Sequence, residues 1–249
     1  MSLSVIVITK NEEDNIKTCL NSVAWADEII VLDSGSTDAT VEICRQYTDK
    51  VYETDWLGFG RQKNRALSYA SGDWILSLDA DEWVTPGLKE EMLMAVNNPG
   101  GHVAFEMPRL SSYCGQYMRH SGWWPDYIVR LSKKGKAKFS EQIVHERLIV
   151  EGSIGRLHNH LMHASFKDLE HVLTKLNRYS KDNAHLLLAE GRKSSLSKAI
   201  LHGLWSFVHT YIVRAGFLDG RMGFVLAISN AEGTYYKYLK LMMLNKDKR

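Results

Sequence analysis

The sequence has few cysteines, and none of them lies in a pairing pattern. The three, Cys19, Cys44 and Cys114, are far apart, odd in number and form no C-x-x-C motif. This excludes a disulfide-stapled secreted domain and predicts reduced thiols in a cytosolic protein. The first residues also lack the basic start and long apolar core of a secretion signal.

A large excess of either charge is also absent, because the formal net charge is +2. Bulk charge therefore indicates no nucleic-acid partner. The distribution is uneven: residues 1–165 hold 17 Lys and Arg against 22 Asp and Glu, whereas residues 166–249 hold 14 against 7. A basic C-terminal third predicts an anionic partner surface for that part of the chain.

Short apolar runs alternate with helical patterns over the first eighty residues. Strands are expected at 3–8, 28–32, 50–53 and 74–78, with helices at 12–23, 39–46 and 61–70. This alternation predicts right-handed βαβ units and an α/β fold with a doubly wound, mostly parallel sheet. A further helix is expected at 87–96, with strands at 102–107 and 127–131.

The pattern becomes helical, without strand alternation, from Phe166 onward. We therefore expect a catalytic domain over residues 1–165 and a helical extension over residues 166–249.

Polar clusters follow the expected strands at their carboxyl ends, where ligands bind in open parallel sheets. They are Thr9–Glu12, Asp33–Ser36, Asp55 with the 58–63 loop, and Asp79–Asp81. Four clusters at one edge predict a pocket. Each also has an ordinary alternative, since Asp33 could cap the next helix and Lys63 could be a solvated helix residue.

Asp79 and Asp81 directly follow an apolar strand, where their like charges repel unless a cation offsets them. Strand alternation would place both carboxylates on one side, within reach of one ion. Oxygen ligands with open positions suit Mg²⁺ or Mn²⁺. A simple strand-ending turn is the alternative. His158, His160 and His163 lack a cysteine partner and a strong zinc spacing.

Four stretches together resemble family 2 glycosyltransferases, which have the nucleotide-sugar-binding GT-A fold. They are "VIVITKNEEDNI", "ADEIIVLDSGSTDATVEI", "GFGRQKNRAL" and "GDWILSLDADEWV". Within that family the sequence resembles lipopolysaccharide core β-glucosyltransferases and related bacterial surface-sugar enzymes, over residues 3 to about 165 and more loosely in the tail. The family's usual Gly after "SGSTD" is Ala39 here, which suits a helix start better than a positive φ.

The resemblance implies specific roles in binding the sugar donor. It places Asp33 at the nucleotide base, Asn11 and Glu12 in the same pocket, and Lys63 near the diphosphate. We expect Thr9 and Ser34 beside them. Asp79 and Asp81 would form the metal-binding D-x-D, with Asp79 also at the donor and His163 as a third ligand, as in some GT-A enzymes.

Family 2 enzymes invert the anomeric centre, so a carboxylate must take the acceptor hydroxyl's proton, while the metal stabilises the departing diphosphate. The candidates are Glu146 in "VHERL", which we favour by resemblance, and Asp126 in "WWPDYIVR". Either could instead pair with Arg130 or Arg147. The preceding Trp123 and Trp124 could stack on a sugar or cover the core.

The resemblance therefore implies a metal-dependent inverting transferase that moves glucose from UDP-glucose to a lipid-linked glycan such as lipopolysaccharide core. Transfer to a polyprenyl phosphate is an alternative. A sugar nucleotidyltransferase is another, but it would carry a Gly- and Arg-rich loop where residues 10–14 are mostly acidic. The G-x-G-x-x-G of a dehydrogenase is missing there.

Residues 199–213 of the tail are mostly apolar, but the run has only fifteen residues and is interrupted by His202 and His209. A membrane span needs about 20. Aromatic and basic residues nearby suit the headgroup level of a bilayer. We expect a cytoplasmic protein, peripheral on the inner membrane. The alternative is that these helices pack on the sheet or form a homo-oligomer interface.

Overall fold

The computed structural model describes residues 1–140 and 147–246. The strands are β1 (Leu3–Thr9), β2 (Glu28–Asp33), β3 (Val51–Glu53), β4 (Trp74–Asp79), β5 (Glu82–Val84), β6 (Ala104–Tyr113), β7 (Gln116–Tyr117), β8 (Asp126–Lys133), β9 (Ala137–Phe139), β10 (Leu148–Val150), β11 (Ile154–Arg156) and β12 (Leu161–Phe166). The helices are α1 (Ile16–Ser22), α2 (Thr40–Cys44), α3 (Phe59–Tyr69), α4 (Pro86–Asn97), α5 (Leu169–Ala189), α6 (Leu196–Val208) and α7 (Gly220–Lys246), with a π turn η1 (His209–Val213) and a 3₁₀ turn η2 (Gly216–Asp219).

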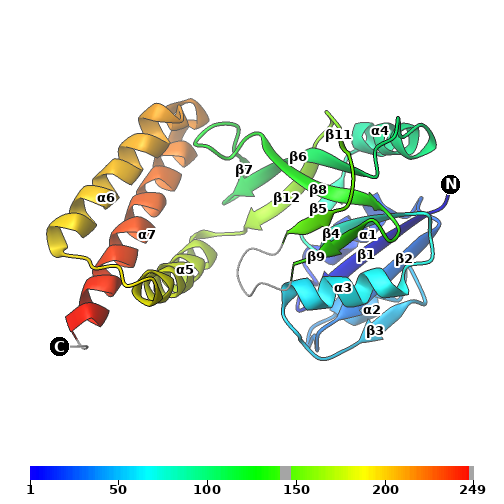
Figure 1. The fold of residues 1–249 in the computed structure, drawn as a ribbon, viewed down its shortest axis with the longest axis horizontal. Coiled ribbons are helices and arrows are strands. Elements are labelled where there is room, and N and C mark those ends of the chain that lie inside the picture. The colour runs from blue at the N-terminus through cyan, green and yellow to red at the C-terminus, as the bar shows by residue number, and fades with distance from the viewer. Residues whose placement is uncertain (141–146, 247–249) are drawn as a thin grey trace. The chain divides into compact units, whose positions relative to one another are not determined.

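The main sheet has the strand order β3-β2-β1-β4-β8-β6-β12-β5, and β7 and β11 also pair with β6 (Figure 1). Strand β1 runs parallel to β2 and β4, and β2 runs parallel to β3. The pairs β4–β8, β6–β8 and β5–β12 are antiparallel. The predicted α/β fold is confirmed: strands β1 to β4 are joined by parallel pairs, and β11 also runs parallel to β6.

Helices cover both faces of the parallel strands, which explains why β1 is buried over its whole length. On one face Val5 and Val7 belong to a core cluster with residues of α1, α2 and α4. On the other face Ile6 and Ile8 pack in a cluster with Ala66 of α3. Alternation along the strand therefore supplies both cores and holds the strand ends in fixed register.

Helix α2 begins at Thr40, and Ala39 before it has φ −75°. A glycine is therefore not required there, as the sequence predicted.

The chain divides into two compact units, residues 1–109 with 126–163 and residues 110–125 with 164–249. The second unit contains α5, α6 and α7 and a core that includes Tyr113, Val172 and Leu226. Asp168 and Ser195 cap α5 and α6, each accepting a hydrogen bond from the backbone three residues on. In residues 1–140 and 147–246, no helix is long and apolar enough to cross a bilayer.

Glu28 is a buried carboxylate at the start of β2, where it is fully partnered. It accepts hydrogen bonds from Ser71 N (2.8 Å), from Ser4 Oγ and from Lys50 Nζ. Burial acts to raise the pKa of Glu28, but the hydrogen bonds from Lys50, Ser4 and Ser71 lower it to about 2. Since the folded pKa is depressed, the charged form stabilises the fold at neutral pH.

We expect Glu28→Gln to lower the free energy of unfolding by about 2–3 kcal/mol at pH 7. The difference from wild type should shrink as pH falls from about 4.5 towards 2, where the wild-type carboxyl also becomes protonated. Urea unfolding at several pH values measures this. The control is Glu53→Gln, whose exposed pair with Arg45 should contribute less than about 1 kcal/mol. Equal losses for both variants, independent of pH, would contradict the prediction.

Candidate active site

The loops after β1 and β2 are tied to each other by hydrogen bonds. The backbone N–H of Asn11 donates to Ser36 Oγ (2.8 Å), and Asn11 Oδ1 accepts from the N–H of Thr37 (2.8 Å). Asn11 has φ +54°, a conformation that Asn adopts more readily than most residues. The Glu12 N–H donates to Thr40 Oγ1 (2.8 Å). The structure therefore brings together the first two predicted clusters.

Asp33 is buried in its own turn, where Oδ2 accepts hydrogen bonds from the N–H groups of Gly35 and Ser36, both at 2.8 Å. Ser34 N–H donates to the Thr9 carbonyl (3.0 Å). Gly35 has φ +83°, which favours glycine. The side chain of Asp33 thus shapes the loop, and its contact with a nucleotide base stays a prediction.

Gln62 is a buried polar residue of this region that the sequence did not single out. Its Nε2 donates to Ser34 Oγ (3.1 Å) and to Thr54 Oγ1 (2.6 Å). Within the described ranges, Gln62 Oε1 and Thr9 Oγ1 are buried without a hydrogen-bond partner. Such atoms cost free energy when unpaired, so they suit a pocket whose ligand supplies the missing partners.

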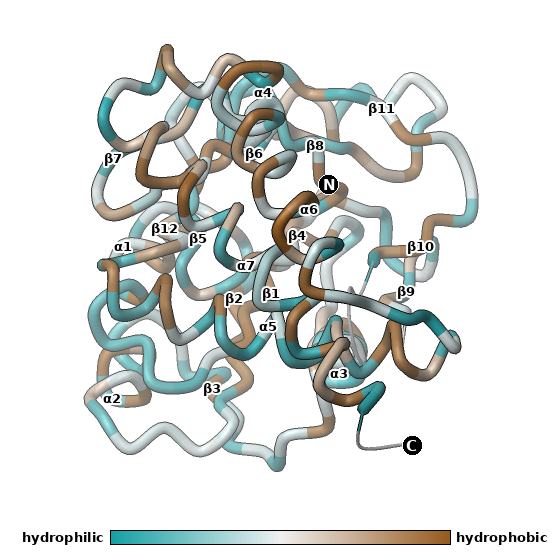
Figure 2. Tube along the Cα trace, turned by 90° about the vertical axis from the view of Figure 1, so that its left-hand side faces the viewer, coloured by the Kyte–Doolittle hydropathy of each residue, from teal (hydrophilic) through white to brown (hydrophobic). Residues whose placement is uncertain are grey.

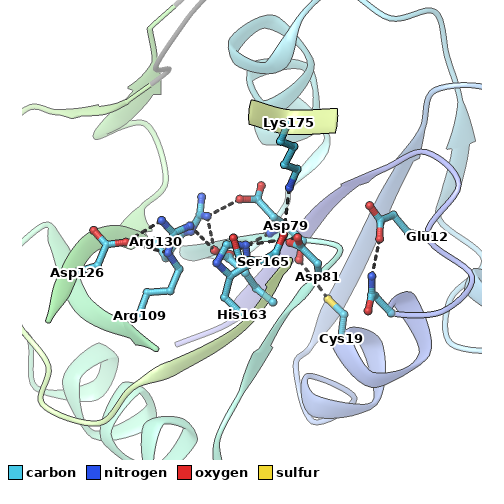
Figure 3. A network of polar contacts seen from close by, with 12 residues as sticks. Glu12, Cys19, Asp79, Asp81, Arg109, Asp126, Arg130, His163, Ser165 and Lys175 are labelled. Carbon is cyan, nitrogen blue, oxygen red and sulfur yellow. Dashed lines mark hydrogen bonds and ion pairs between the residues drawn. The ribbon is translucent and has the colours of Figure 1, made fainter. Parts of the chain in front are cut away.

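Asp79, at the end of β4, lies between two buried cations, of which Figure 3 shows Arg130. Its Oδ1 is 2.7 Å from Lys63 Nζ, and its Oδ2 is 2.5 Å from the guanidinium of Arg130. Burial acts to raise the pKa of Asp79, but the charges of Arg130 and Lys63 hold it well below its usual range. Lys63 is therefore a buried partner of the acidic cluster and not a solvated helix residue.

Arg130 links this pair to further charges that the sequence did not place there. The same guanidinium nitrogen lies 2.6 Å from Oε1 of the fully buried Glu82. Arg109 lies 3.1 Å from Glu82 Oε1 and donates to Asp126 Oδ2 through two nitrogens, at 2.7 and 3.0 Å. Asp126 therefore forms an ion pair with Arg109, where the sequence suggested Arg130 or Arg147. Its role as a base stays a prediction.

Asp81 lies in the turn between β4 and β5, with Oδ2 3.4 Å from His163 Nε2 of β12. Because β4 ends at Asp79, strand alternation does not extend to Asp81, and the assumption that it aligns the two carboxylates was wrong. The structure does bring together two of the three predicted metal ligands. No group of three His, Cys, Asp or Glu side chains among residues 1–140 and 147–246 converges closely enough to hold a metal ion.

The other two histidines of the segment have different described contacts. His158 is exposed and lies 3.1 Å from Glu91, and the carbonyl of His160 accepts a hydrogen bond from Thr85. Glu146, the favoured base, lies outside the described residues.

An acidic turn after a parallel strand, buried cations beside it and two loops joined by hydrogen bonds therefore lie at the carboxyl ends of the parallel strands. In a comparison with known proteins, residues 4–155 match the family described as glycosyl transferase family 2. The chain belongs to glycosyl transferase family 2. It is therefore a glycosyltransferase, and inversion at the anomeric carbon is typical of this family.

Relatives extend over nearly the whole chain. An uncharacterized glycosyltransferase of Rickettsia typhi is 32% identical, and the alignment covers 99% of this chain and 89% of the relative. The lipopolysaccharide core biosynthesis glycosyltransferase LpsC of Rhizobium meliloti is 29% identical over 93% and 88%.

Among solved structures, glucosyl-3-phosphoglycerate synthase from Mycobacterium tuberculosis, in complex with Mg²⁺ and UDP, aligns with a TM-score of 0.50. The identity is 20%, over 78% of this chain and 81% of that one. This likeness supports the GT-A fold that the sequence predicted.

Proposed function

We propose that this glycosyltransferase moves glucose from UDP-glucose onto a lipid-linked glycan such as lipopolysaccharide core. The reaction would use Mg²⁺ or Mn²⁺. The observation that carries the proposal is the grouping of Asp79, Lys63 and Arg130 at the carboxyl end of β4, with Asp81 and His163 in contact nearby. The name of the relative LpsC supports the acceptor class. The Mg²⁺ and UDP in a structure of the same fold guide the first ligands to test.

Asp81 and His163 would hold the divalent cation with one carboxylate oxygen and one imidazole nitrogen, which lie 3.4 Å apart, and the diphosphate and water would supply the remaining ligands. When bound, the ion supplies charge neutralisation for the leaving diphosphate. Asp79 would contribute at the same edge, but its carboxylate also holds the side chains of Lys63 and Arg130 in place. These cations are positioned to stabilise negative charge that develops on the diphosphate.

The acceptor hydroxyl attacks the anomeric carbon, the bond from that carbon to the diphosphate oxygen breaks, and a carboxylate takes the hydroxyl proton. We assign the proton to Glu146, with Asp126 as the alternative. Thr9, Asn11, Glu12, Asp33 and Ser34 would line the nucleotide end of the donor site. Among the residues that the structure describes, the buried Oγ1 of Thr9 has no hydrogen-bond partner, which supports a polar ligand there.

A screen of nucleotide sugars tests this function. Release of free nucleotide from UDP-glucose, UDP-N-acetylglucosamine, UDP-galactose and GDP-mannose would be measured with Mn²⁺, with Mg²⁺ and with EDTA. We expect one UDP-sugar to be hydrolysed slowly without acceptor, and only with a metal. Pyrophosphate release from nucleoside triphosphate plus sugar phosphate would instead identify a nucleotidyltransferase. Faster turnover with polyprenyl phosphate than with a lipopolysaccharide acceptor would favour that alternative.

We also propose that the second unit binds the cytoplasmic face of the inner membrane through an apolar face, which we call the α6 face. Its exposed side chains, each at least half accessible, are Leu201, Leu204 and Trp205, which lie three and four residues apart on α6 and therefore share one face. Much of α6 is correspondingly hydrophobic in colour in Figure 2. The net positive charge of residues 166–249 complements an anionic bilayer, and the lipid-linked acceptor is met there.

Binding to anionic vesicles is the expected result for this membrane proposal. The chain should co-sediment with anionic vesicles at low salt and release as salt rises, since each basic residue near the surface contributes about 1 kcal/mol. The double variant Leu201→Gln/Trp205→Gln should bind at least about tenfold more weakly. The matched control is Met94→Gln, an equally exposed apolar residue of α4. Equal recovery in the supernatant with neutral and anionic vesicles, together with a dimer in size exclusion, would make the α6 face an oligomer interface.

A further inference from the structure

The second unit contains a cavity of about 260 Å³ between α5 and α7, lined only by residues of that unit. Its wall includes three aromatic rings, Tyr113, Trp123 and Phe166, whose centroids are 5.7–5.9 Å apart. The cavity is somewhat smaller than the roughly 300–1,000 Å³ of sites for drug-sized ligands. Its size therefore suits one monosaccharide unit rather than a whole glycan.

The polar part of the wall consists of hydroxyl, amide and ammonium groups. Asn230 and Thr234 come from α7, and the Tyr113 hydroxyl lies 2.8 Å from Ser229 Oγ. None of the residues that line the cavity is acidic. Aromatic faces beside amide and hydroxyl groups are the combination expected to bind the apolar and the polar sides of a sugar.

Two lysines of the wall, Lys175 and Lys237, have no carboxylate partner within the described ranges of the chain. Lys175 Nζ donates to the Ser165 carbonyl (3.1 Å) and lies 4.8 Å from the centre of the Phe166 ring. Lys237 lies over Tyr238, and partial burial lowers the pKa of its ammonium group. Two half-buried cations facing a cavity without acids carry a desolvation cost that an anion would offset.

We propose that this cavity binds an anionic sugar residue, with a carboxylate or phosphate held by Lys175 and Lys237 and the ring packed against Trp123 and Phe166. Under the proposed function this residue belongs to the acceptor glycan, and that part of the inference rests on the proposed function. The sequence left open whether Trp123 stacks on a sugar or covers the core. Trp123 packs in a core cluster and also lines the proposed sugar cavity, so both interpretations would hold.

The test is ligand-observed NMR titration of the full chain with glucuronate, glucose 6-phosphate and glucose. We expect one of the two anions to bind at least about tenfold more tightly than glucose, because hydrogen bonds to charged groups contribute more than neutral ones. Which anion binds better distinguishes a carboxylate from a phosphate ligand. Lys175→Gln and Lys237→Gln should each weaken that binding by about tenfold. Lys181→Gln, an exposed lysine of α5 outside the cavity, is the control and should change it by less than twofold.

Two results would overturn the assignment. One is binding of glucose as tight as that of both anions; the other is anion binding that Lys175→Gln and Lys237→Gln leave unchanged while their unfolding curves match wild type. Octyl glucoside that outcompetes both anions would place an alkyl chain in the cavity and would also overturn the assignment. These binding measurements do not depend on sugar transfer. If the chain hydrolysed no nucleotide sugar, the proposed function would be refuted, and the titrations would still show whether the cavity binds an anionic sugar.

Discussion

Asp81→Asn is expected to lower sugar transfer by about 10²–10³-fold and to leave the free energy of unfolding nearly unchanged. The side chain of Asp81 is partly exposed, and its described partner is His163 at 3.4 Å. Loss of its charge removes a proposed metal ligand without leaving a buried charge unpaired. Transfer rates across a Mn²⁺ titration and thermal unfolding of the same preparation measure the two effects.

Asp79→Asn is the matched comparison, because the same substitution two residues away should also damage the fold. It would leave Lys63 and Arg130 buried beside a neutral amide, and removal of one partner from a buried ion pair costs about 3–5 kcal/mol. Both variants should lose activity, but only Asp79→Asn should lose stability. An Asp81→Asn enzyme that retains a third of the wild-type rate would remove Asp81 from the metal site.

The parallel half of the fold was predictable from the sequence, whereas the antiparallel half was predictable only in part. Strands such as β1 are buried on both faces and therefore appear as unbroken apolar runs. The predicted strand ended at Met107, yet β6 continues to Tyr113 with Pro108 opposite Tyr127 of β8. Proline is rare inside sheets, so local propensity alone could not predict this continuation.

In the candidate site, residues near strand ends were predictable from the local sequence, whereas residues brought there by strand pairing were not. Asp79 and the loops after β1 and β2 were predictable because each follows a strand end, and Lys63 was singled out by the family resemblance. Arg109 and Arg130 were not, since they lie on β6 and β8 and reach Glu82 and Asp79 only through strand pairing distant in sequence. The negative charge that closes β4 is thus offset by protein cations as well as by any bound metal.

The division into units was also beyond a linear reading of the sequence. Residues 110–125 belong with the C-terminal helices because Tyr113 and Met118 pack with Val172 and Leu226. A boundary drawn at residue 165 separates these partners, and nothing in the composition of residues 110–125 indicates the contact.

The largest loss of turnover is expected from Glu146→Gln, which should slow transfer by about 10²–10⁴-fold with donor affinity nearly unchanged. The glutamine keeps the size of the side chain but cannot accept the acceptor hydroxyl's proton. The rate of transfer at saturating donor and the KM for donor measure this. Glu151→Gln, an exposed carboxylate in the same stretch of sequence, is the control and should transfer sugar at the wild-type rate.

Asp126→Asn decides between the two candidate bases. Its Oδ2 accepts both hydrogen bonds from Arg109, which would still pair with Glu82 after the substitution. If Asp126 only orients Arg109, we expect a loss of less than about tenfold, because the pair is partly exposed and contributes modestly. If Asp126→Asn instead loses the full 10²–10⁴-fold expected for a general base and Glu146→Gln stays near wild type, the assignment is reversed and Asp126 takes the proton.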